Sequence, residues 1–189
     1  MKRAFVLASF VLFAASSLLF PAARPSADAA ADWPVSLVDV AREAGLVHPS
    51  VYGGVERKRF IVETNGAGVA FLDYDTDGWL DALVLSGTRL GEGGREEERF
   101  PDGEAPTNRL YRGRGDGTFR DVTAQVGLRR HGWASSVCAG DYDDDGWLDF
   151  FVTYYGRNVL YRNRGGERFE DVTEAAGLAT PGPLRWGAG

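Results

Sequence analysis

The chain has little of the chemistry that most catalytic sites use. Its 189 residues include one cysteine, one methionine and two histidines. The single cysteine, Cys138, excludes an intramolecular disulfide framework. There is no Gly-rich phosphate loop, zinc-ligand spacing or nucleophile elbow in the sequence. Because no catalytic motif is present, we expect a protein that is not an enzyme.

Positive charge is also in the minority. The chain has 21 Lys and Arg residues against 27 Asp and Glu, which gives a formal net charge of −6. Proteins that bind nucleic acid need a basic patch to neutralise phosphates. The acidic balance therefore argues against a nucleic-acid partner.

Long apolar runs are confined to the start of the chain. Lys2 and Arg3 precede an apolar stretch over residues 4–20, and small residues with Ala-x-Ala spacing follow up to Ala31. This order is typical of a secretory signal peptide. We expect residues 1–31 to be removed, which would leave no membrane span in a protein that is secreted, periplasmic or on the cell surface. Retention of the run as a membrane anchor is the alternative.

Two copies of one acidic loop are the most informative feature of the sequence. They are Asp73-Tyr-Asp-Thr-Asp-Gly-Trp-Leu-Asp81 and Asp141-Tyr-Asp-Asp-Asp-Gly-Trp-Leu-Asp149, and they begin 68 residues apart. At 4 Å, two like charges repel by about 1 kcal/mol in water and by about 4 kcal/mol at an effective dielectric constant near 20. Carboxylates at positions 1, 3, 5 and 9 would therefore repel one another unless a cation lay between them. We expect two sites for Ca²⁺, which takes six to eight oxygen ligands from flexible loops.

The ligand set follows from the loop positions. Side chains at positions 1, 3, 5 and 9 and the backbone carbonyl at position 7 would surround the ion, and the glycine at position 6 would permit the turn. The predicted metal-binding residues are Asp73, Asp75, Asp77, Trp79, Asp81, Asp141, Asp143, Asp145, Trp147 and Asp149. Empty acidic turns and magnesium sites are the alternatives.

The flanks of the loops favour β-hairpins over EF-hands. An EF-hand needs a bidentate Glu at position 12, but that position holds Val84 in one copy and Val152 in the other. Residues 68–72 and 80–85 flank the first loop, and residues 148–154 follow the second; all are rich in β-branched or aromatic residues. The sequence therefore predicts a calcium loop within each of two hairpins.

The similarity extends beyond the loops. Asn108-Arg-Leu-Tyr-Arg matches Asn158-Val-Leu-Tyr-Arg, and the Phe-x-Asp-Val-Thr segment at Phe119 recurs at Phe169. Each copy thus has four short strands, as a β-propeller blade does. The first copy also carries an insertion over residues 91–106, which is rich in Gly, Glu and Arg. We interpret it as a solvated loop, with a partner-binding loop as the alternative.

These motifs make the chain similar to the FG-GAP/VCBS repeat family of integrin-α-like propellers. More narrowly, it resembles bacterial proteins related to cartilage acidic protein, which carry such repeats ahead of an ASPIC/UnbV domain. The resemblance implies an all-β partial propeller of about two four-stranded blades, each with a calcium loop in its first hairpin. Because closed propellers have at least four blades, we expect an N-terminal part of a longer protein.

The resemblance also implies an organisation and a role. We expect an N-terminal segment with a lone closing strand at 32–64, blades at 65–132 and 133–182, and the start of a third blade at 183–189. The implied role is that of a non-catalytic binding or scaffold module for an extracytoplasmic protein or glycan. The alternatives are a propeller attached to a hydrolase or lyase domain outside these residues, and a nonfunctional gene product.

Overall fold

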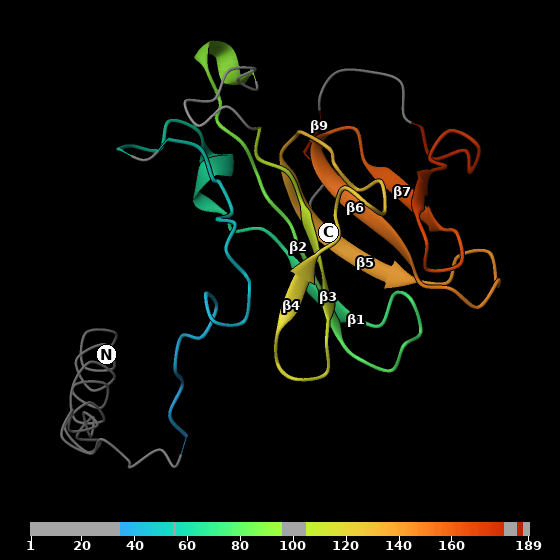
Figure 1. The fold of residues 1–189 in the computed structure, drawn as a ribbon. Helices are drawn as coiled ribbons and strands as arrows, with labels where there is room; N and C mark the ends of the chain where they lie inside the picture. Colours follow the sequence, from blue (N-terminus) through green and yellow to red (C-terminus); the bar gives the residue numbers. More distant parts are fainter. Residues whose placement is uncertain (1–34, 55, 96–104, 180–184, 187–189) are drawn as a thin grey trace, which may run out of the picture. The chain divides into compact units, whose positions relative to one another are not determined.

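The computed structural model describes residues 35–54, 56–95, 105–179 and 185–186 (Figure 1). The predicted signal peptide lies outside the described residues. The chain divides into two parts, Met1–Asp39 and Val40–Gly189. Of the first part, residues 35–39 are described and contain no regular secondary structure. Both sheets belong to the second part, and each sheet with its connecting loops forms one repeat unit.

Two antiparallel sheets make up the fold, with strand orders β1-β2-β3-β4 and β5-β6-β7-β8. The first contains β1 (Val69–Leu72), β2 (Asp81–Val84), β3 (Arg109–Gly113) and β4 (Phe119–Asp121). The second contains β5 (Ala134–Gly140), β6 (Asp149–Gly156), β7 (Val159–Asn163) and β8 (Phe169–Asp171). The short strand β9 (Arg185–Trp186) pairs with β6, and two 3₁₀ turns, η1 (Ile61–Thr64) and η2 (Glu92–Gly94), lie in the connections.

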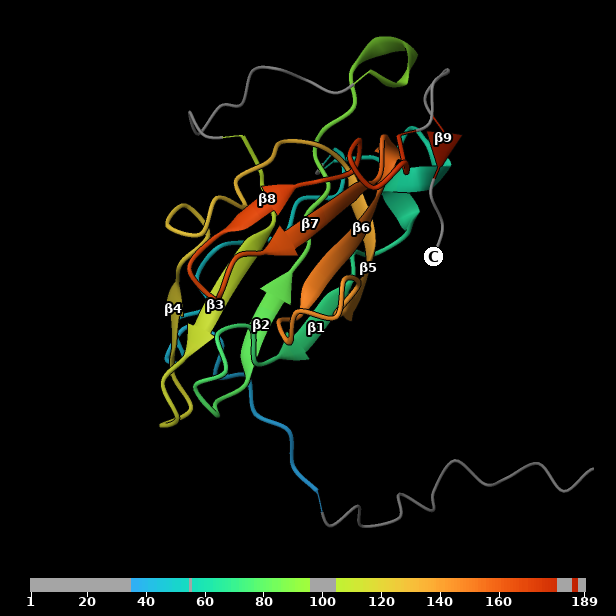
Figure 2. The same ribbon diagram turned by 90° about the vertical axis from the view of Figure 1, so that its right-hand side faces the viewer.

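This architecture confirms the predicted fold class. The described residues form two four-stranded antiparallel units without α-helix, as expected for part of a β-propeller. Each acidic loop joins the first two strands of its sheet, and both loops leave the same end of the sheets (Figure 2). Of the predicted insertion, the described part contains η2, while residues 96–104 lie outside the description.

One hydrophobic core joins the two sheets. Leu83 and Leu110 of the first sheet and Phe150 of the second are fully buried and belong to the same cluster. The rings of Phe150 and Phe169 stack with centroids 4.6 Å apart. Because removal of apolar area from water is the main favourable term in folding, each sheet stabilises the other.

The second sheet also contacts the first acidic loop directly. The Asn163 Nδ2 donates a hydrogen bond of 2.8 Å to the carbonyl of Tyr74, and the ring of Phe169 packs at 6.0 Å from that of Tyr74. Gly166 lies so close that a Cβ there would come within 2.8 Å of the Asp75 Cβ. As a result, Tyr74 is only 3% exposed, whereas its counterpart Tyr142 is 46% exposed.

The Asp-Val…Gly-Leu segments form turns that link one unit to the next. In the first repeat, the Val126 N–H donates to the Val122 carbonyl, and the Val126 carbonyl accepts from the N–H of Phe169 in β8. The segment over residues 40–46 has the same turn, with Ala44 N–H donating to Val40, and its Ala44 carbonyl accepts from Phe119 in β4. No strand is assigned among the described residues of the segment 32–64. The lone closing strand expected there stays a prediction.

The contact at Gly166 gives a test of the packing between the sheets. We expect Gly166→Ala to destabilise the protein by about 1–3 kcal/mol more than Gly165→Ala, because overpacking costs that amount. Both glycines have positive φ, +75° at Gly166 and +69° at Gly165, but an added Cβ at Gly165 would meet no atom within 4 Å. Urea unfolding of the two variants measures the difference. Equal losses would contradict a tight contact between Gly166 and the acidic loop.

Candidate metal centre

Each acidic loop is closed by its first aspartate. The two carboxylate oxygens of Asp73 accept hydrogen bonds from the backbone N–H groups of Asp77 (3.0 Å) and Gly78 (2.9 Å). Asp141 receives the equivalent bonds from Asp145 and Gly146 at 3.1 and 2.7 Å. The glycine at position 6 is required because its φ is +88° in both loops, a conformation that costs residues with a Cβ. The sequence therefore folds each loop around its own carboxylate.

The aspartate at position 9 fixes each loop to its sheet. Asp81 is 0% exposed and accepts hydrogen bonds from the backbone N–H groups of Tyr74 (3.0 Å) and Gly113 (2.8 Å). Asp149 has the same role in the second loop, with partners at Tyr142 and Asn163. Burial raises the pKa of both carboxyl groups. The protein thus keeps an acidic group in a place that disfavours its charged form.

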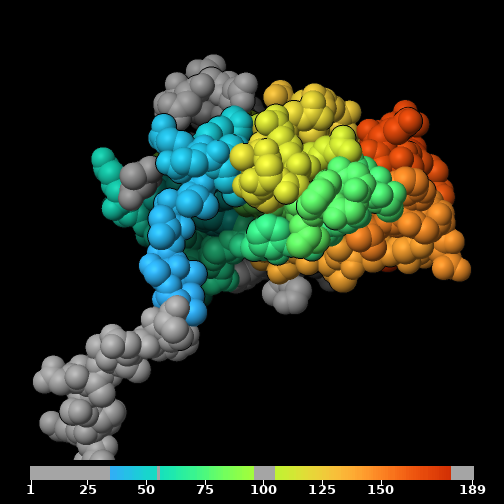
Figure 3. Space-filling view, turned by 60° about the horizontal axis from the view of Figure 1, so that its bottom comes forward, coloured from blue at the N-terminus to red at the C-terminus, as the bar shows by residue number. Residues whose placement is uncertain are grey.

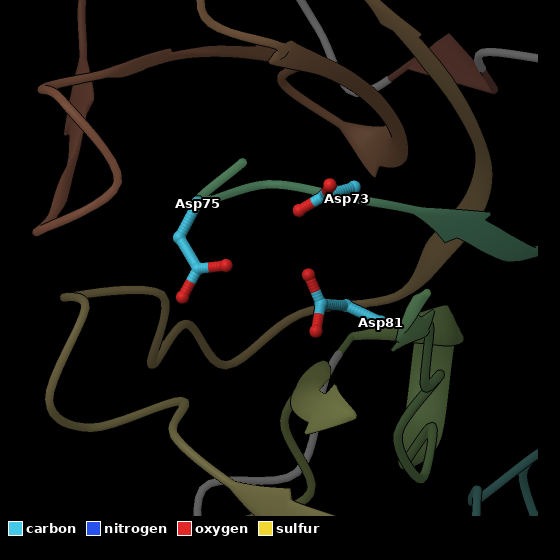
Figure 4. Close-up of side chains that lie close together, drawn as sticks. All are labelled: Asp73, Asp75 and Asp81. Carbon is cyan, nitrogen blue, oxygen red and sulfur yellow. The ribbon is translucent and has the colours of Figure 1, made fainter. Parts of the chain in front are cut away.

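Three aspartates converge in each loop. One carboxylate oxygen from each of Asp73, Asp75 and Asp81 lies within 4.8 Å of the other two, and Figure 4 shows the three carboxylates facing one another. Asp141, Asp143 and Asp149 form the second cluster with the same spacing. These six residues are the predicted ligands at positions 1, 3 and 9.

A buried oxygen without a partner shows that the clusters suit a cation. The Oδ1 atoms of Asp75 and Asp143 are inaccessible to solvent and have no hydrogen-bond donor. An unpartnered buried acceptor is costly, and a cation among the carboxylates would satisfy it. Burial also raises the pKa of Asp75, although the Arg112 guanidinium opposes this shift. The donor set is made of oxygen, as hard divalent ions require.

An arginine takes part in each site, which the sequence analysis missed. The Arg112 side chain contacts Asp75 and Asp77, with N–O distances of 2.8 Å to each. Arg162 contacts Asp143 at 2.6 Å and Asp145 at 2.9 Å. Both arginines are the last residue of the repeated Asn-x-Leu-Tyr-Arg motif, so the repeat contained a signal for them.

Position 5 therefore faces an arginine rather than the cluster. The backbone N–H of Trp79 and the Arg112 side chain lower the pKa of Asp77, and the Arg162 side chain lowers that of Asp145. Metal ligation by Asp77 and Asp145 remains a prediction. So does ligation by the backbone carbonyls of Trp79 and Trp147.

Comparison with known families supports the repeat interpretation. The family described as FG-GAP-like repeat matches residues 100–152 and again residues 141–189. A search of curated proteins found no match to the chain. The first match includes β3 to β5, and both matches include the second acidic loop. Residues 100–189, which include the second sheet and its acidic loop, are thus similar to FG-GAP-like repeats.

Proposed function

We propose that the chain is an exported, calcium-binding β-propeller repeat protein that acts as a non-catalytic binding or scaffold module for a protein or glycan. The observation that supports this function best is the pair of acidic clusters, each with three converging carboxylate oxygens and one buried oxygen that lacks a donor. Neither feature is expected of a simple solvated turn.

Calcium suits these clusters better than magnesium. Ca²⁺ accepts irregular geometry and six to eight oxygens, whereas Mg²⁺ needs near-octahedral coordination and keeps several waters. In the first loop, Asp73, Asp75 and Asp81 would hold the ion. The bound cation would supply the positive charge that Asp75 Oδ1 lacks. Extracellular modules bind calcium with dissociation constants on the order of 10⁻⁴–10⁻³ M, which fits two small, partly exposed sites.

The ion would act on the fold through the position-9 aspartates. Asp81 is bonded to the N–H of Gly113 at the end of β3, and Asp149 to that of Asn163 at the end of β7. Asn163 in turn donates to Tyr74 in the first loop. A metal ion held by these carboxylates would thus stabilise the hairpins and the contact between the two units. This is a structural role, in keeping with a binding module.

Two features support an extracytoplasmic location. The N-terminal residues have the pattern of a signal peptide, and FG-GAP-like repeats are typical of extracellular proteins. Among the described residues, no helix has the length and apolar character needed to cross a bilayer. A calcium-rich compartment would keep weak sites loaded.

Thermal unfolding with calcium and with a chelator tests the proposal. A ligand at 100 times its dissociation constant stabilises the folded state by about 2.7 kcal/mol per site. For a domain of this size, each occupied site thus raises the Tm by about 5–10 °C. We expect Asp75→Asn or Asp143→Asn to remove roughly half of the rise. The exposed turn variant Asp116→Asn serves as the control and should keep the full rise; identical melting with and without calcium would contradict the proposal.

The arginine at the first site gives a second test. We expect Arg112→Gln to lower the Tm of the calcium-free protein, because Asp75 and Asp77 lose their counter-charge. The calcium-induced rise in Tm should become larger by about 2 °C or more, since less positive charge then opposes the ion. Arg168→Gln changes an exposed arginine that has no ion pair with a described residue, and it should alter neither value. A smaller calcium effect in Arg112→Gln would indicate that the arginine supports the metal rather than competing with it.

A further inference from the structure

The two β-hairpins that follow the acidic loops differ in charge. In the second unit, Arg162 lies opposite Glu170 across β7 and β8, and in the first unit Arg112 lies opposite Arg120 across β3 and β4. Like charges directly opposite each other in a sheet are destabilising. The first hairpin therefore carries an arrangement that the second avoids.

A second arginine of the first hairpin, Arg114, also lacks the ion pair that its counterpart forms. Arg164 contacts Glu170 at 2.6 Å, but Arg114, its counterpart, forms no ion pair with any carboxylate of the described chain. The same holds for Arg120. Asp116, two residues after Arg114, is held by Thr118, whose N–H and hydroxyl donate to it at 2.9 and 2.6 Å. Two exposed guanidinium groups thus line one surface, each without an ion pair to a described carboxylate.

An indole ring lies beside these arginines. Trp79 is 52% exposed, and one side of it packs on Gly115, where an added Cβ would come within 2.4 Å of the ring. Together they line a surface cavity of about 380 Å³, formed by Asp77, Trp79, Arg112, Gly113, Arg114 and Arg120. On the molecular surface, the segment of the first acidic loop (green) lies against that of β3 and β4 (yellow) (Figure 3). This volume is within the range of about 300–1,000 Å³ for small-molecule sites.

The cavity does not repeat the surface by which one unit packs on the next. That surface depends on Asn163, which donates to Tyr74, and on Gly166, which lies against Asp75. The corresponding residues of the first unit are Gly113 and Asp116. Gly113 has no side chain to donate, and Asp116 would place a carboxylate where a glycine is needed. The same mode of contact with another acidic loop is therefore disfavoured here.

We infer that this cavity binds a carboxylate-bearing sugar, a hexuronate. The electron-rich face of Trp79 would pack against the C–H groups of the pyranose ring, and Arg114 and Arg120 would bind its carboxylate. The inference deepens the proposed role as a glycan-binding module and rests on it. The ligand class follows from this cavity because Arg114 and Arg120, which form no ion pair with a described carboxylate, line it together with the exposed indole of Trp79.

Binding of methyl β-glucuronide and methyl β-glucoside to the calcium-loaded protein tests the inference. These two probes differ in one carboxylate, so we expect the glucuronide to bind at least about tenfold more tightly, the factor that a charged hydrogen bond supplies. Ligand-observed NMR measures both affinities, and quenching of tryptophan emission that disappears in Trp79→Phe locates the site. Equal affinity for the two sugars, or no binding, would overturn the assignment.

The second repeat supplies the matched variant. Arg120→Glu recreates the arrangement of Glu170 and should lower glucuronide affinity about tenfold or more, and Arg120→Gln should lower it without a new charge. Arg168→Glu makes the same charge change elsewhere and should stay within about twofold of the unmodified protein. Calcium uptake is measured on the same samples. If calcium binds but the sugars are not distinguished, the sugar assignment fails while the calcium proposal stands.

Discussion

Crowding of carboxylates in two short loops is the constraint on which the rest of this structure depends. In each loop, the repulsion between carboxylates is reduced because each carboxylate has different hydrogen-bond or ion-pair partners. The aspartate at position 1 accepts backbone N–H groups of its own loop, and Asp81 and Asp149 accept N–H groups from the sheet. Arginines from neighbouring strands face positions 3 and 5. One oxygen at position 3 is left without a partner in each loop, an arrangement that suits a cation.

The same loops connect local chemistry to the packing of the two units. Tyr74 follows Asp73 in the chain, yet it is buried by Asn163 and Phe169 of the second unit. The carboxylate of Asp149 accepts from the N–H of that same Asn163. The two acidic clusters are therefore linked through one side chain and one strand end. Order in one loop should favour order in the other, because both depend on the position of Asn163.

Much of the fold could be predicted because its signals are local and repeated. Segments rich in β-branched and aromatic residues and the repeated motifs predicted the strands, and the Asp and Gly positions predicted the hairpin loops that the structure contains. The repeated motif marks Arg112 but does not reveal its partner, because Arg112 lies 35 residues from Asp77 and reaches it only through the pairing of β2 and β3. The pairing of β9 with β6 could not be predicted either, because a strand of two residues is too short to show a β-strand pattern in the sequence. Asp77 and Asp145 are predicted ligands from spacing alone, and spacing cannot show which carboxylates an arginine will face.

Calcium uptake by the purified protein, measured by isothermal titration calorimetry, tests the central claim most directly. The account predicts two ions bound per chain, with one lost when Asp75 is replaced and the other when Asp143 is replaced. This result would show that each cluster holds its own ion. No heat of binding to the folded protein, or an unchanged stoichiometry in both variants, would contradict the view that these loops are calcium sites.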